Sequence, residues 1–125
     1  MTGLPGQTGR RVLVIEAEPA TLRVCRDVLE SSGFIVDAVD RGIAAVVAAR
    51  AALPDLIFIA MQLPDVPGRE AIRWLRSNPA LRSTPIVVLT TSAEDDVALA
   101  ATRPSASLRK PVSAVGIRRT IRRVL

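Results

Sequence analysis

The 125-residue chain contains no histidine and no tyrosine, and only 2% of its residues are aromatic. Without histidine it lacks both the commonest general base and the commonest metal ligand of proteins. Without an aromatic platform, recognition of nucleic acids by base stacking is disfavoured. The single cysteine, Cys25, cannot form an internal disulfide, which fits a reducing, cytoplasmic setting.

Long hydrophobic runs are also missing. No stretch approaches the roughly 18 apolar residues of a membrane span, and the first ten residues lack the apolar core of a secretory signal. We therefore expect a flexible N-terminal leader over residues 1–10. The remaining length suits one domain, residues 11–125, and the 49% hydrophobic content is sufficient for its core.

The charge of the chain is one-sided. The formal net charge is +5, and Lys110 is the only lysine, so the positive charge is almost entirely arginine. A basic balance favours anionic partners such as acidic protein faces or phosphates. A general arginine bias of a GC-rich genome is the simpler explanation of the same composition.

Apolar runs alternate with segments of helical period. The expected strands cover 11–15, 34–39, 56–60, 86–90 and 106–109. The expected helices run from Pro19 to a stop at Gly33, from 41 to 51 behind an Asp40 cap, through the stripe Ala71, Ile72 and Leu75 to Asn78, from Ser92 to about 101, and from 113 to 125. This alternation, with strands that are apolar on both faces, predicts a three-layer α/β/α sandwich around a parallel sheet.

In such sheets the functional groups gather where the strands end. Glu16 and Glu18 follow the first strand, Ala60 ends the third, Thr90 ends the fourth and Lys110 follows the fifth. These side chains are expected at one edge of the sheet.

Four segments, 14–19, 54–64, 85–90 and 108–111, resemble in order and spacing the motifs of the bacterial response-regulator receiver domain. The resemblance covers residues 10–125. It implies a flavodoxin-like sheet of five strands in the order 2-1-3-4-5, a cis bond before Pro111, and work in a two-component signalling pathway.

The departures from that family are concentrated in its phosphorylation pocket. Ala60 stands where the family has its phosphoacceptor aspartate, and Ala17 stands where it has its main metal-binding aspartate. An alanine methyl group cannot act as a nucleophile, and Mg²⁺ requires well-placed oxygen ligands. We therefore expect no catalytic residue, metal or cofactor, and a degenerate pocket made of Glu16, Ala17, Glu18, Ala60, Thr90 and Lys110.

Within this pocket we expect Lys110 to pair with Glu16, with Thr90 hydrogen-bonding nearby, because an unpaired buried lysine is costly. A small anion bound there is the alternative. Ser107 occupies the position of the family's aromatic switch, so the usual switch is also expected to be absent. Asp65 could be a displaced phosphoacceptor, but its loop position favours a turn former.

Arginine dominates one side of the last helix. The apolar stripe Ala114, Ile117, Ile121 and Val124 predicts a buried face, and the arginines fall on the other side. That side is either a solvated surface or a landing site for carboxylates or phosphates. Trp74 either covers neighbouring aliphatic groups or anchors a partner, and Cys25 is expected in the core.

These observations favour a degenerate receiver, a non-catalytic module that binds signalling proteins without phosphorylation. The expected partners are a histidine kinase, another regulator or a second copy of the chain. The alternative is a binding module for an anionic second messenger, cyclic di-GMP. DNA contact is less favoured because no helix-turn-helix pattern is visible, and an enzyme is the least favoured class. The residues that would bind a partner or ligand are Arg103, Arg118, Arg119, Arg122 and Arg123.

Overall fold

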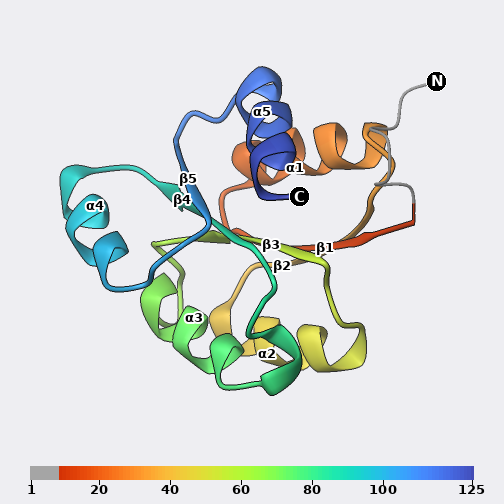
Figure 1. Cartoon of the computed structure of the whole chain (residues 1–125). Coiled ribbons are helices and arrows are strands. Elements are labelled where there is room, and N and C mark those ends of the chain that lie inside the picture. The colour runs from red at the N-terminus through yellow and green to blue at the C-terminus, as the bar shows by residue number, and fades with distance from the viewer. Residues whose placement is uncertain (1–8) are drawn as a thin grey trace.

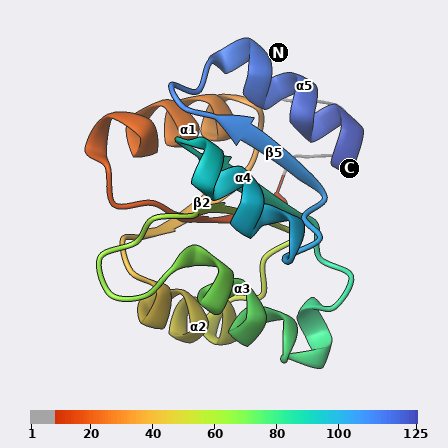
Figure 2. The same ribbon diagram turned by 90° about the vertical axis from the view of Figure 1, so that its left-hand side faces the viewer.

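The chain folds into a parallel sheet between two layers of helices (Figures 1 and 2). The computed structural model describes residues 9–125, apart from the side chains of residues 93, 94, 96 and 97. The strands are β1 (Arg11–Ile15), β2 (Ile35–Val39), β3 (Leu56–Ala60), β4 (Ile86–Thr90) and β5 (Ala106–Arg109). The helices are α1 (Pro19–Ser31), α2 (Gly42–Ala51), α3 (Gly68–Arg76), α4 (Ala93–Ala100) and α5 (Ala114–Val124), with a 3₁₀ turn, η1, at Pro79–Leu81.

Most of the predicted leader, residues 1–8, lies outside the described residues. None of the helices among residues 9–125 has both the length and the apolar content to cross a bilayer.

The strand order is β2-β1-β3-β4-β5, with every pair parallel, as the resemblance implied. The three central strands are buried on both faces apart from Arg11 at the start of β1, which explains why they read as continuous apolar runs. β2 and β5 form the two edges, and both carry partly exposed residues.

Alternate residues of the central strands face two separate hydrophobic clusters. Leu13 and Ile15 face the cluster built with α2 and α3, to which α4 also contributes. Val12 and Val14 face the cluster built with α1 and α5. Figure 1 shows these two helical layers above and below the sheet.

Most helix ends lie where the sequence predicts them. Gly33, with a φ of 102°, ends the turn after α1, a conformation that glycine adopts at little cost. The hydroxyl groups of Ser92 and Ser113 accept hydrogen bonds from the N–H groups of Asp95 (3.3 Å) and Gly116 (3.0 Å), and so cap α4 and α5.

The predicted cap of α2 is wrong. The helix begins at Gly42, Arg41 occupies the cap position, and its side chain makes no cap hydrogen bond. The carboxylate of Asp65 caps this helix instead, from the β3–α3 loop. It accepts hydrogen bonds from the N–H groups of Gly42 (2.9 Å) and Ile43 (3.0 Å). Asp40 precedes the cap position and is exposed.

Candidate functional site

The residues that end β1, β3, β4 and β5 meet at one edge of the sheet, here called the carboxyl edge. The pairing of β4 with β5 sets Thr90 opposite Arg109, and the N–H of Lys110 donates to the Thr90 carbonyl oxygen at 2.8 Å. The pairing of β3 with β4 sets Ala60 opposite Leu89. The bond between Lys110 and Pro111 is cis, as expected.

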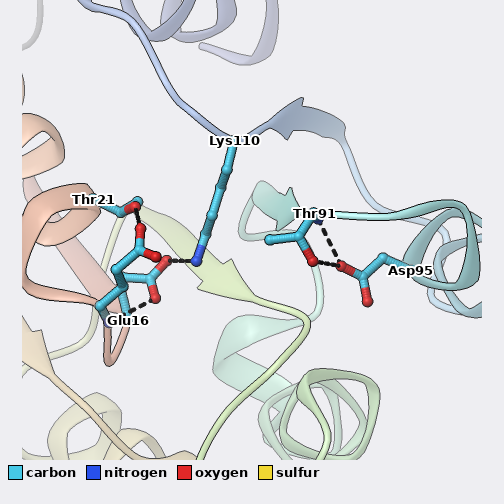
Figure 3. Close-up of polar contacts among 6 residues, drawn as sticks. Glu16, Thr21, Thr91, Asp95 and Lys110 are labelled. Carbon is cyan, nitrogen blue, oxygen red and sulfur yellow. Dashed lines mark hydrogen bonds and ion pairs between the residues drawn. The ribbon is translucent and has the colours of Figure 1, made fainter.

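A buried ion pair occupies the centre of this edge (Figure 3). Lys110 Nζ lies 2.7 Å from Glu16 Oε1, and the side chains are only 12% and 1% exposed respectively. The other oxygen, Glu16 Oε2, accepts a hydrogen bond from the Glu18 N–H at 3.0 Å. The predicted pairing of Lys110 with Glu16 is therefore confirmed.

At two other pocket positions, Ala60 and Ala17, the side chain has no oxygen atom that could bind a metal ion. Ala60 is 1% exposed and presents a methyl group, and Ala17 is partly buried. The Glu18 carboxylate turns to α1, where it accepts a hydrogen bond from the Thr21 hydroxyl. Among the described residues, no group of three or more carboxylate, thiol or imidazole side chains could hold a metal ion.

The receiver resemblance implies a Mg²⁺ site, and these residues do not fit one. Mg²⁺ requires several oxygen ligands in near-octahedral geometry. Of the carboxylates that the structure describes, Glu16 is the one at the centre of this edge, and the Lys110 ammonium already neutralises it. The ammonium group of Lys110 only donates hydrogen bonds, so it cannot be a metal ligand. Its positive charge would also repel a metal ion bound to the same carboxylate oxygen.

Asp95 connects the two loops beside this edge, which the sequence did not indicate. Its Oδ2 accepts hydrogen bonds from the N–H (2.7 Å) and the hydroxyl (2.9 Å) of Thr91, and its Oδ1 accepts one from Gln62 Nε2 at 2.7 Å. We call Gln62, Thr91 and Asp95 the Asp95 cluster. Figure 3 shows the Thr91 contacts beside the Lys110 pair. The cluster fixes the β3–α3 loop to the start of α4.

The Asp95 cluster favours the ionised carboxylate. Asp95 is 2% exposed, and burial alone would raise its pKa. The hydrogen bonds from Thr91, Gln62 and the Ser92 backbone outweigh this effect and hold the pKa below its ordinary value. Thr90 is also buried, and its backbone carbonyl oxygen accepts the hydrogen bond from the Lys110 N–H.

Asp65 belongs to the α2 cap and to its own turn. Besides the two α2 N–H groups, it accepts a hydrogen bond from the Val66 N–H at 3.0 Å, so the predicted turn former is confirmed. Hydrogen bonds from the Ile43 and Gly42 N–H groups lower the pKa of Asp65. Its carboxylate is therefore engaged in capping, and it lies in the loop beyond β3 rather than at the strand end.

Cys25 lies on the buried face of α1, in the core cluster between α1, α5 and the sheet, as predicted. Burial raises the pKa of its thiol to about 12, and the nearby negative charge of Glu16 contributes to this rise. At neutral pH the thiol is therefore protonated and shielded from solvent. Ser107, at the position of the family's aromatic switch, is exposed on the edge strand β5.

The arginines of α5 lie as the apolar stripe predicted. Ile117 and Ile121 are buried, and Ala114 and Val124 pack at the margin of the same cluster. Arg103 occupies the α4–β5 turn with a φ of 47°, a strained conformation for a residue with a Cβ. Of the five predicted binding residues, Arg118 is partly buried and the other four are exposed: Arg103, Arg119, Arg122 and Arg123.

Comparison with known proteins agrees with the fold and the strand order. A family model described as the response regulator receiver domain matches residues 12–122. The polar-differentiation response regulator DivK of Brucella anthropi is 30% identical over 118 residues, which cover 93% of this chain and 96% of that protein.

Two solved structures have similar folds. The chemotaxis response regulator CheY4 of Vibrio cholerae has a TM-score of 0.87 at 26% identity, covering 94% of this chain and 100% of that one. The receiver domain of the sensor histidine kinase PA1611 of Pseudomonas aeruginosa, with magnesium in its active-site cleft, has a TM-score of 0.85 at 28% identity, covering 94% and 98%. The chain therefore belongs to the response regulator receiver domains.

Proposed function

We propose that this receiver domain works without phosphorylation, as a non-catalytic module that binds other signalling proteins in the cytoplasm. The observation that carries the proposal is the Lys110–Glu16 pair beside Ala60. Lys110 Nζ lies 2.7 Å from the one carboxylate at the centre of the carboxyl edge, and β3 ends in a methyl group. Phosphoryl transfer to a receiver needs an acceptor oxygen and a divalent cation to neutralise developing charge. This pocket supplies no acceptor and already has a cation.

The surrounding loops support the same function. A phosphorylation switch requires an element with two arrangements of similar free energy. Here the β3–α3 loop is fixed to α4 through Gln62 and Asp95, and to α2 through Asp65. These contacts favour a single arrangement of the loops. The expected partners remain a histidine kinase, another regulator or a second copy.

Beryllofluoride with Mg²⁺, which imitates a phosphoryl group on an aspartate, tests the proposal. We expect the ¹H–¹⁵N spectrum of the full chain to be unchanged by beryllofluoride beyond the effect of matched salt. Acetyl phosphate should add no mass to the protein. The receiver domain of PA1611, which holds magnesium in its cleft, is the positive control. Specific shifts around Ala60 and Thr90, or an acid-stable, hydroxylamine-sensitive phosphoprotein, would overturn the proposal.

A second candidate function is binding of an anionic nucleotide such as cyclic di-GMP. It is favoured by the exposed arginines of α5, since guanidinium groups bind phosphates bidentately. The α4–β5 turn and the C-terminal end of α5 both lie at the end of the sheet opposite the carboxyl edge. Arg103 is therefore at the same end of the molecule as Arg122 and Arg123. Calorimetric titration with cyclic di-GMP tests this candidate. Heat that the double substitution Arg122→Ala/Arg123→Ala abolishes would support it, and no heat would reject it.

A further inference from the structure

Helix α2 is apolar on the side that faces away from the sheet. Its inner face is made of the small residues Gly42, Ala45 and Ala49, which are buried. The outer stripe at i, i+4 and i+7 contains Ile43, Val47 and Arg50, and the two aliphatic side chains are 59% and 65% exposed. A helix at a protein surface ordinarily turns polar residues outward, and a helix that is apolar on all sides is typical of a covered position.

The same face is hollowed where α2 meets α3. A cleft of about 350 Å³ is lined in part by Ile43, Val47 and Trp74. A second cleft, of about 270 Å³, continues toward η1 and is lined in part by Leu75 and Leu81. Val46, Arg50, Trp74 and Ser77 line both clefts, so the two form one groove, here called the α2–α3 groove. Trp74 is partly exposed within the groove, which is compatible with both predicted roles, covering neighbouring aliphatic groups and anchoring a partner.

Among the described residues that line the groove, Arg50 is the only charged one. It is exposed, and it has no ion-pair partner within the described part of the chain. An apolar groove lined by one guanidinium group without an ion-pair partner is complementary to an apolar segment with one carboxylate.

A second copy of the chain fits this groove poorly. In a twofold symmetric dimer the same patch meets itself, so the Arg50 side chains would approach one another. Each chain also carries a net charge of +5, which disfavours self-association further. An acidic partner gains from both features. A concave groove also suits protruding side chains of a peptide better than a flat lipid surface.

We infer that the α2–α3 groove is the docking surface for a peptide segment of a partner protein, with apolar anchors and an aspartate or glutamate that pairs with Arg50. This inference rests on the proposed function and names the face through which it operates. Ile43, Val47 and Trp74 supply the apolar contact, and Arg50 sets the register of the bound segment.

Selection of random displayed peptides against the full chain tests the inference. We expect the recovered peptides to combine aliphatic or aromatic anchors with an acidic residue. Their affinity should fall about tenfold or more with Val47→Asp and with Arg50→Glu, the scale of a lost anchor. It should stay within about twofold with Arg23→Glu, a charge reversal of the same kind at an exposed position of α1, in the other helical layer. Replacing the peptide's acidic residue by arginine should restore binding to Arg50→Glu.

All the variants change exposed residues, so their spectra and thermal unfolding should match those of the parent chain. The inference is overturned if no peptide is recovered, if binding depends on Arg23 but not on Val47, or if the charge exchange restores nothing. Sedimentation with phosphatidylglycerol vesicles that Val47→Asp abolishes would assign the groove to a lipid surface and also overturn it. Repeating the titration with beryllofluoride and Mg²⁺ separates the two proposals. If beryllofluoride changes the affinity of the peptides for the chain, the proposed function alone is refuted. If no peptide binds the groove and the chain does not respond to beryllofluoride, this inference alone is refuted.

Discussion

Lys110 Nζ and Glu16 Oε1 lie 2.7 Å apart at the end of the sheet, where both side chains are nearly inaccessible to water. Each charge has been removed from solvent, and each depends on the other for compensation. Such a pair contributes little net stability relative to well-packed apolar residues, but removing one partner is costly. Under the proposed function, this pair and Ala60 form a closed structural contact in place of a pocket that binds an anion and a cation.

The first prediction concerns Glu16→Gln, which leaves the Lys110 ammonium buried without a counter-charge. We expect the free energy of unfolding to fall by about 3–5 kcal/mol at neutral pH, the usual cost of breaking a buried ion pair. Urea denaturation measures it. The double substitution Glu16→Gln/Lys110→Met should recover part of the loss, because it removes the orphaned charge as well. A loss below about 0.5 kcal/mol, typical of exposed surface positions, would mean that water or another group compensates Lys110.

The second prediction concerns the Asp95 cluster in acid. The pKa of Asp95 is lower in the folded chain than in the unfolded one, so the unfolded state binds the proton first. The stabilisation is therefore present above about pH 4, the ordinary range of an aspartate, and is lost as the pH falls through the folded value. We expect Asp95→Asn to be less stable than the parent chain at neutral pH, and the difference to shrink in acid. A difference independent of pH would show that the carboxylate charge is immaterial.

The strands and the Lys110–Glu16 pair could be predicted because their causes are local or topological. Buried parallel strands read as unbroken apolar runs, and one lysine after β5 meets the carboxylates after β1 once the strand order is known. The Asp95 cluster could not be predicted in the same way. Gln62 lies 33 residues from Asp95, and either side chain alone is an ordinary polar residue in a loop.

The α2 helix illustrates the same limit. Its apolar composition predicts a helix, but alanine and valine on every side leave no polar face to orient it. The cap was wrong for a related reason. Asp40 is adjacent in sequence, whereas Asp65 reaches Gly42 from 23 residues away through the fold of the β3–α3 loop. Which face of α2 is exposed, and hence the α2–α3 groove, follows only from the packing.

The third prediction concerns the thiol of Cys25. Its pKa is raised to about 12 by burial, so the folded state keeps its proton when the unfolded state has lost it. The sign is the reverse of that for Asp95. The contribution is complete below about pH 8.5, the pKa of a free thiol, and it is lost as the pH rises toward the folded value.

Comparison of the parent chain with Cys25→Val measures this effect, because the replacement is apolar and of similar size. Above about pH 8.5, the stability of the parent relative to the variant should fall by about 1.4 kcal/mol per pH unit. At neutral pH a disulfide reagent should modify Cys25 only as fast as the protein opens. Rapid modification of the native chain would contradict the burial of the thiol.

The last prediction restores oxygen ligands to the carboxyl edge. Ala17→Asp/Ala60→Asp places carboxylates at the two positions where the pocket now has methyl groups, beside Glu16. Three acidic groups with one lysine carry an unbalanced negative charge, so we expect this variant to be less stable than the parent chain without metal. Mg²⁺ should relieve that repulsion. At about ten times its Kd, a ligand specific for the folded state adds about 1.4 kcal/mol to the free energy of unfolding.

Chemical denaturation with and without MgCl₂, at matched ionic strength, measures the gain. Ala80→Asp/Ala101→Asp is the matched control, because it adds the same two charges at exposed positions away from the pocket. The control and the parent chain should both be insensitive to Mg²⁺, since neither has ligands beyond the paired Glu16 at the centre of the edge. Stabilisation of the parent chain by Mg²⁺ would mean that Glu16 can leave Lys110 for a metal, and the proposal of a closed pocket would then be rejected.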